Sequence, residues 1–207
     1  MTQWSAWTMR LHGFAVLKRC RDDRAGVTAV EFALAAPVLI VLLMGIFDIG
    51  HMTYVTAALH GAVQRVARSG TLESVNTTSE DAFVATVVQQ AAPGATVSTS
   101  RKSYFDFANI ARPEAWNDNN SNGTCDNSEA YTDENENGRW DADVGESGNG
   151  GANDVVLYTV TVTYKPLFPV PGLTNRDNTR TLQASAVKKN QPFALQDSPG
   201  SEAGNCN

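Results

Sequence analysis

The feature that most constrains this chain is an unbroken apolar run, FALAAPVLIVLLMGIF, at residues 32–47. As an α-helix this run would be about 24 Å long, and counted from Val27 it reaches about 31 Å, enough to cross the hydrocarbon core of a membrane. A buried core helix would need a large domain around it, and a cleaved secretory signal would need a small-x-small site soon after the run, which the sequence lacks. A membrane-spanning helix is therefore the favoured interpretation.

The charges on either side of this run predict its orientation. Residues 1–26 contain five basic and two acidic residues, and a basic flank is typical of the cytoplasmic side of a span. We therefore expect a cytoplasmic N-terminus, contact with membrane lipid, and a periplasmic or extracellular C-terminal domain. The formal net charge of −6 argues against nucleic acid as a partner, because phosphate contacts need a basic surface.

The junction between the basic head and the apolar run has a recognisable pattern. RDDRAG ends at Gly26, and VTAVEF follows, with Val27, Glu31 and Phe32 at its first, fifth and sixth positions. This resembles the prepilin peptidase site of type IV pilin-like proteins, in which cutting falls after the glycine. The wider segment, residues 24–68, resembles the N-terminal signature of TadE-like pseudopilins of tight-adherence (Flp) pili, and residues 184–193 are similar to the closing strand of that family.

The resemblance implies a role, a location and a set of partners. It implies a non-enzymatic minor pilin or pseudopilin of the bacterial inner membrane, associated with the pilus and acting in pilus assembly. The partners implied are the prepilin peptidase, the major Flp pilin, the related TadF- and TadG-like pseudopilins, and the inner-membrane assembly platform. Two alternatives remain open: an uncut, single-pass anchored protein with calcium-dependent adhesion, and a pseudopilin of another secretion system.

Processing would also give Glu31 a partner. Cutting after Gly26 creates a free amine at Val27, and residues 27 and 31 lie on one helix face, about 6 Å apart along the axis. An ammonium and a carboxylate at that spacing can pair within one subunit or between neighbours, which offsets part of the cost of placing either charge in lipid. The simpler alternative is that Glu31 reaches the membrane interface.

Beyond the span, the patterns predict an α+β, pilin-like fold. An apolar stripe at helical spacing (Met52, Val55, Leu59, Val63, Val66) extends the first helix to about Ser69, and Thr77-x-x-Glu80 is a candidate capping box for a second helix ending near Gln90. Strict alternation predicts strands at 156–164 and 182–186, with a weaker candidate at 97–107. We expect a leader at 1–26, a transmembrane helix half at 27–50, and an outer domain at 51–207 with a small antiparallel sheet. Asp48 is expected at the membrane interface, and the last dozen residues are expected to be frayed.

An acidic insert at residues 114–153 is the second informative feature. Its span from Glu114 to Glu146 holds ten acidic residues and one basic residue. It begins with a match to the twelve-residue calcium loop, with Gly123 at the sharp turn. The oxygen ligands predicted for this first loop are Asp118, Asn120, Asn122, the Thr124 carbonyl, Asp126 and Glu129.

The same pattern restarts fifteen residues later. The ligands predicted for the second loop are Asp133, Asn135, Asn137, the Arg139 carbonyl and Asp141. Its twelfth position is Val144, so the bidentate ligand is missing, and Asp143 or Glu146 are the candidate substitutes. We expect one or two calcium ions with a structural role, in loops too closely spaced for EF-hand helices; the alternative is a solvated Asn/Asp/Gly linker.

The remaining reactive residues favour structural roles. Cys20 lies in the leader, which leaves Cys125 and Cys206 as a possible disulfide in an oxidising compartment. His51 and His60 lie on opposite sides of a helix and are not expected to share a metal. The sequence contains no G-x-S-x-G or H-E-x-x-H motif, so no enzymatic activity is predicted.

Overall fold

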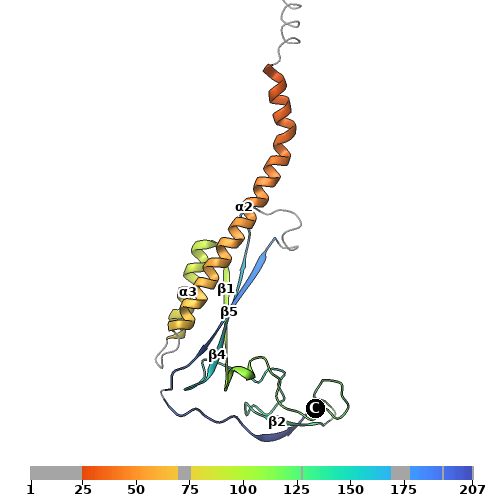
Figure 1. Cartoon of the computed structure of the whole chain (residues 1–207), viewed down its shortest axis with the longest axis vertical. Coiled ribbons are helices and arrows are strands. Elements are labelled where there is room, and N and C mark those ends of the chain that lie inside the picture. The colour runs from red at the N-terminus through yellow and green to blue at the C-terminus, as the bar shows by residue number, and fades with distance from the viewer. Residues whose placement is uncertain (1–24, 70–75, 127, 169–177, 193, 207) are drawn as a thin grey trace, which may run out of the picture. The chain divides into compact units, whose positions relative to one another are not determined.

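The computed structural model describes residues 25–69, 76–126, 128–168, 178–192 and 194–206 (Figure 1). Its contacts divide the chain into residues 1–47 and residues 48–207. The elements, in chain order, are α2 (Ala25–Ser69), α3 (Thr77–Ala91), β1 (Thr96–Tyr104), the 3-10 turn η1 (Phe107–Asn109), β2 (Ala130–Asp133), β3 (Glu146–Ser147), β4 (Val155–Tyr164), β5 (Arg180–Lys189) and β6 (Glu202–Asn205).

The first part of α2 presents its apolar side chains outward. Phe32 and Leu34, for example, are 65% and 75% exposed, and Pro37 lies within the helix. Among the described residues this is the one helix long and apolar enough to cross a membrane. A bilayer removes such a surface from water, so the exposure fits membrane anchoring.

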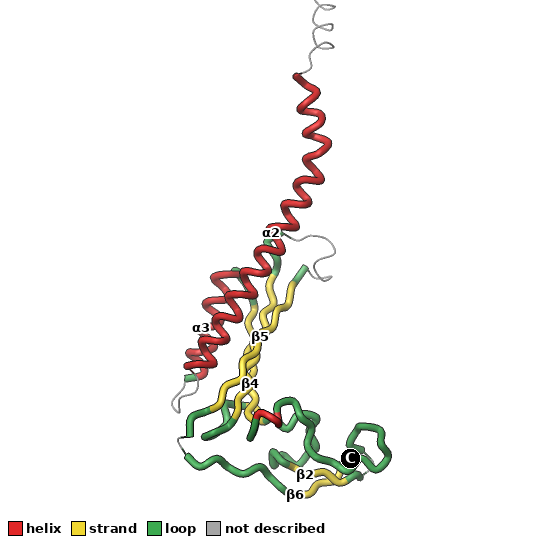
Figure 2. The backbone as a smooth tube through the Cα atoms, viewed as in Figure 1, coloured by secondary structure: helices red, strands yellow, loops and turns green. Residues whose placement is uncertain are grey.

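The second unit contains a four-stranded antiparallel sheet in the order β3-β1-β4-β5 (Figure 2). β4 is central, and its Val160 pairs with Thr99 of β1 and Ala184 of β5. The β4 residues Tyr158, Val160 and Val162 are buried while the threonines between them are partly exposed, because a strand turns alternate side chains to opposite faces. The predicted α+β fold, with a long helix and a small antiparallel sheet, is confirmed.

Both helices of this unit pack on the same face of the sheet. Val55 and Leu59 of α2 and Val84 and Val88 of α3 are fully buried with the inward side chains of β4 and β5. Burial of each such side chain contributes about 1.5–3 kcal/mol, so this cluster is the main apolar support of the unit. The second half of α2 is thus amphipathic, as its apolar stripe predicts.

Ion pairs connect both helices to the sheet. Asp48 of α2 is fully buried and accepts hydrogen bonds from Arg180 of β5, with a shortest N–O distance of 2.7 Å. Asp81 of α3 accepts from Arg101 and Tyr158. Burial acts to raise the pKa of Asp81, but the hydrogen bonds and charge of Arg101 outweigh it and the pKa is lowered.

The start of α3 differs from the predicted capping box. Asn76 is the N-cap, and its side chain accepts from the backbone N–H of Ser79, while Thr77 is the first residue of the helix. Glu80 does not turn back to the cap; it is buried and pairs with Arg101 at 3.3 Å. The pattern located the helix correctly but named the wrong cap, because asparagine caps a helix as well as threonine does.

The C-terminal segment is ordered, so the prediction of a frayed end is wrong. β6 pairs with β2 in a two-stranded antiparallel sheet, in which Tyr131 lies opposite Gly204. Cys206 is joined to Cys125 by a disulfide that spans 81 residues of sequence, with the two Cα atoms 5.5 Å apart. Together these contacts fasten the tail to the acidic insert.

Candidate functional site

The predicted processing junction lies at the beginning of α2. Gly26, Val27, Glu31 and Phe32 are all exposed. A Cβ added to Gly26 would meet no atom within 4 Å, and its φ is not in the left-handed region. The fold therefore does not require glycine at position 26, although glycine weakens a helix relative to alanine. Residues 1–24, the rest of the predicted leader, lie outside the described residues.

In the acidic insert, the first loop is organised around Asp118. Its carboxylate accepts from the backbone N–H groups of Asn122 and Gly123, and the amide side chains of Asn120 and Asn122 donate to Asp126. Gly123 has φ +76°, which favours glycine at this turn. At the end of the loop, Glu129 is 3% exposed and accepts from the backbone N–H groups of Asn119, Asn120 and Asp126.

The second loop repeats this arrangement residue by residue. Asp133 accepts from the N–H groups of Asn137 and Gly138, and the amides of Asn135 and Asn137 donate to Asp141. The backbone also repeats: Ser121 and Glu136, at the fourth position of each loop, both have φ 57°, and the sixth-position glycines have φ 76° and 77°. The two loops therefore share one conformation over their first nine positions.

The twelfth position is where the loops differ. Val144 is buried beside Tyr104 and Val155. The N–H groups of Glu134, Asn135 and Asp141, which correspond to the three that Glu129 accepts in the first loop, are accepted here by Glu114. The two suggested substitutes, Asp143 and Glu146, line a cavity on another side of the loop, together with Asn135, Asn137 and Asp141. There Asp143 accepts from Lys102 and Tyr104, and Glu146 is an exposed residue of β3. Sequence reasoning missed Glu114 because it lies 19 residues before the loop it serves.

The donor set of both loops suits a hard cation. The groups are carboxylate, amide and backbone carbonyl oxygens, which are the ligands that Ca²⁺ takes in proteins. Among the described residues, no group of three or more His, Cys, Asp and Glu side chains could hold a metal by itself. Any cation would therefore also need the asparagine and carbonyl oxygens of the loops. The residues present fit calcium rather than zinc, which prefers sulfur and nitrogen ligands.

Comparison with known proteins bears on the helix and not on the loops. The model of the TadE-like protein family matches residues 26–68. This segment is TadE-like. The match supports a pilin-like protein of the Tad system, in a family that is structural rather than enzymatic. No curated protein and no solved structure matches the chain.

The TadE-like segment coincides with most of α2 and begins at Gly26. The match therefore includes Val27, Glu31 and Phe32, together with the helix half that packs on the sheet. The acidic loops lie outside it.

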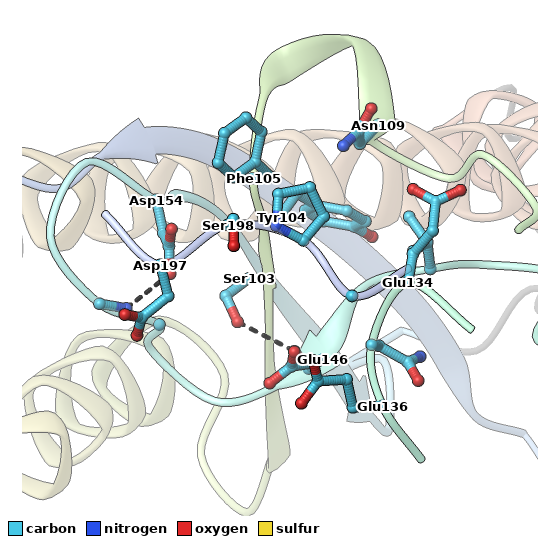
Figure 3. Close-up of a pocket in the computed structure, with 16 residues that line it drawn as sticks. Ser103, Tyr104, Phe105, Asn109, Glu134, Glu136, Glu146, Asp154, Asp197 and Ser198 are labelled. Carbon is cyan, nitrogen blue, oxygen red and sulfur yellow. Dashed lines mark hydrogen bonds between the residues drawn. The ribbon is translucent and has the colours of Figure 1, made fainter. Parts of the chain in front are cut away.

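A polar cavity of about 510 Å³ lies between β1 and the second loop, as Figure 3 shows. Its carboxylates include Glu134, which is paired with Arg112, and Asp154, which accepts from the Gly151 N–H and the Gln196 amide. The Ser103 hydroxyl donates to the Glu146 carbonyl oxygen. Burial and the neighbouring Asp143 raise the pKa of Tyr104 to about 12, so its hydroxyl stays protonated at neutral pH. These groups tie β1, the loops and the tail together.

Proposed function

We propose that this chain is a TadE-like minor pilin, or pseudopilin, that is cut after Gly26 by prepilin peptidase and then supports assembly of Flp-type adhesive pili. The observation that carries the proposal is the coincidence of three features at one place. The TadE-like match begins at Gly26, the basic head of the sequence ends there, and Glu31 lies five residues further on, ahead of the apolar run. Packing gives no reason for a glycine at position 26, whereas a processing site does.

Cleavage would change the chemistry of the helix end. In the uncut chain the nitrogen of Val27 is an amide, which carries no charge. After cutting it becomes an ammonium one helical turn from the Glu31 carboxylate, and the pair lowers the cost of holding either charge in lipid. In this proposal, release of the leader is therefore the step that fits the helix for packing beside other subunits.

The TadE-like resemblance implies the partners, and the exposed surface of α2 is where they would make contact. The exposed apolar side chains of α2 from Val27 to Ile49 would contact membrane lipid before assembly. The same face would contact the helices of the major Flp pilin and of other Tad pseudopilins afterwards. The inner-membrane assembly platform would receive the cytoplasmic end, and the domain at 51–207 would lie in the periplasm or outside the cell.

The decisive experiment is to identify the N-terminal peptide of the membrane-extracted protein by mass spectrometry. Cells with prepilin peptidase should yield a chain that starts at Val27, and cells without it should yield the uncut chain. Gly26→Leu should block the cut, while Gly45→Leu, at a second helical glycine with no atom within 4 Å of an added Cβ, should not.

The two alternatives make different predictions in the same cells. A chain that keeps residues before Val27 in normal cells would contradict the pilin-like role and leave an anchored adhesion protein. A cut chain that co-purifies with a secretion apparatus and not with Flp pilin would favour a pseudopilin of another system. Pulldown from cross-linked membranes separates these two results.

We further propose that the acidic loops bind one or two calcium ions that stiffen the insert. The specific support is that two stretches matching the consensus also adopt one repeated conformation, including the left-handed glycine at the sixth position. Isothermal titration of the full chain in detergent should show Ca²⁺ binding with a Kd of about 10⁻⁴ M or weaker, as in extracellular modules. Equal binding of Mg²⁺, or no binding at all, would contradict a calcium site.

A further inference from the structure

The second loop is incomplete as a calcium loop if only its own twelve residues are counted. The consensus ends in a glutamate that gives two oxygens to the ion, and Val144 stands at that position. Val144 is 8% exposed and packs against Tyr104 and Val155, so it belongs to a small apolar cluster. A complete second site needs a carboxylate from another part of the chain.

Short β-pairing brings Glu114 to the right place. Trp116 and Tyr131 form an antiparallel bridge, and the N–H groups of Asn117 and Thr132 donate to the carbonyls of Ala130 and Ala115. In that register, residue 114 lies opposite residue 133, the first position of the second loop. Trp140 fixes the backbone of the same residue by donating its ring N–H to the Glu114 carbonyl at 3.1 Å.

The carboxylate of Glu114 then reproduces the contacts of Glu129. It accepts from the N–H of Glu134 at 2.8 Å and from that of Asp141 at 3.0 Å, while Glu129 accepts from Asn119 at 2.8 Å and Asp126 at 3.4 Å. In both loops these donors stand at the second and ninth positions. The two glutamates therefore hold equivalent places, although one precedes its loop and the other ends it.

A separate observation, the weak compensation of the buried charge on Glu114, points to a cation. Glu114 is fully buried and forms none of the ion pairs found in the described residues. The guanidinium of Arg112 is paired with Glu134 and acts on Glu114 through its charge alone. Burying a carboxylate costs several kcal/mol, and neutral N–H donors together with a shared cation offset only part of that cost. A divalent cation in the second loop would supply further positive charge.

The other carboxylates near this loop already have partners or face solvent. Asp143 is paired with Lys102 at 2.6 Å and also accepts from Tyr104. Glu146 belongs to the two-residue strand β3 and is exposed. Both line a cavity with Asn135, Asn137 and Asp141, but Glu114 is the fully buried carboxylate that accepts from the backbone N–H groups of the loop.

We propose that Glu114 is the twelfth-position ligand of the second loop, giving both carboxylate oxygens to a calcium ion also held by Asp133, Asn135, Asn137, the Arg139 carbonyl and Asp141. The proposal rests on the calcium binding proposed above. Its consequence is that the two sites interlock, because the ligand of the second lies directly before the first. Residues 114–141 would then order as one unit when the ions bind.

Calcium titration of the full chain in detergent tests this assignment. Wild type should bind two ions, and Glu114→Gln and Glu129→Gln should each lose one, with at least a hundredfold weaker binding at the altered loop. Glu146→Gln and Asp143→Asn are the matched controls and should retain two. Glu114→Asp keeps the charge but shortens the reach, so it should weaken one site about tenfold.

Hydrogen exchange locates the lost site and checks folding. With calcium present, Glu114→Gln should raise exchange in residues 133–141 and leave the strand β4 unchanged. If wild type binds two ions and Glu114→Gln also binds two, or if a control loses one instead, the assignment of Glu114 is overturned while calcium binding stands. If wild type binds no calcium, the proposed calcium function itself fails.

Discussion

Residues 48–207 contain two regions that are held together in opposite ways. In the helix-covered sheet, the buried side chains are apolar: Val55, Leu59 and Val88 from the helices meet Val160 and Val162 of β4. In the loop region, formed by residues 114–146 together with β6, three of the buried side chains are acidic, namely Glu114, Glu129 and Asp133. A disulfide joins Cys125 of the first loop to Cys206, the residue after β6.

The difference shows where the specificity of each region comes from. Apolar burial is non-directional, so the sheet region needs only the correct period of hydrophobic residues and tolerates changes that keep volume. A buried carboxylate costs free energy unless it is hydrogen-bonded, and hydrogen bonds are directional, so each carboxylate needs donors at defined positions. The loop region therefore depends on individual contacts, and its β2–β6 pairing of four residues on each strand is too short to support it alone.

Truncation in the apolar region should have the largest effect on global stability. Leu59→Ala removes a fully buried side chain between α2 and the sheet, and we expect a loss of about 3 kcal/mol in the free energy of unfolding. Denaturant unfolding of the detergent-solubilised chain, followed by circular dichroism, measures it. Leu34→Ala, on the exposed part of α2, is the control and should change this value little. Equal losses for both would mean that the two halves of α2 do not differ in packing.

Loss of the disulfide should act on the loop region and spare the sheet. Removal of a disulfide typically costs about 2–4 kcal/mol of stability. Here the disulfide also holds β6 and the backbone of Glu129 in place, because the Cys206 N–H donates to the Glu129 carbonyl. We expect Cys206→Ser to raise hydrogen exchange in residues 118–141 and 202–205.

The sheet region supplies the comparison for this variant. Exchange in β4 should stay as in the wild type, because Cys206 bonds to Ser128 and Glu129 and packs beside Tyr131, all in the loop region. If β4 exchanged faster as well, the two regions would form one cooperative unit. Alkylation of both thiols in the protein without reductant would show that the cysteines are not paired.

The sheet region could be predicted well from the sequence, because the spacing of its hydrophobic residues is enough to identify its helices and strands. The alternation from Val156 to Tyr164 and the stripe from Met52 to Val66 located the central strand and the packed half of α2 correctly. The sequence could not identify partners that are distant along the chain. Asp48, for example, is buried in an ion pair with Arg180, 132 residues away in sequence.

The candidate loop site was predicted only in its local part. The positions from Asp118 to Glu129 and from Asp133 to Asp141 are local patterns, and the structure gives both stretches one shape. Glu114 could not be recognised, because its place depends on the bridge between Trp116 and Tyr131. The ordered tail was missed for the same reason, since β6 has few apolar residues and is defined by its partner strand.

Acid should produce the smallest of these effects and should again separate the regions. Burial acts to raise the pKa of Asp143, but hydrogen bonds, chiefly from Lys102, outweigh it and the pKa is lowered. The hydrogen bond from Arg112 lowers the pKa of Glu134. A carboxyl with a lowered folded-state pKa stabilises the fold above its unfolded pKa and loses that contribution as the pH falls through the folded value. The free energy of unfolding should therefore decrease between pH 6 and pH 3, and Asp143→Asn should reduce this decrease by about 1 kcal/mol or less.

The control is Glu146→Gln, at an exposed position of β3, which should leave the dependence of stability on pH as in the wild type. A profile that Asp143→Asn does not alter would mean that the pairing of Asp143 with Lys102 contributes nothing to holding the second loop against β1.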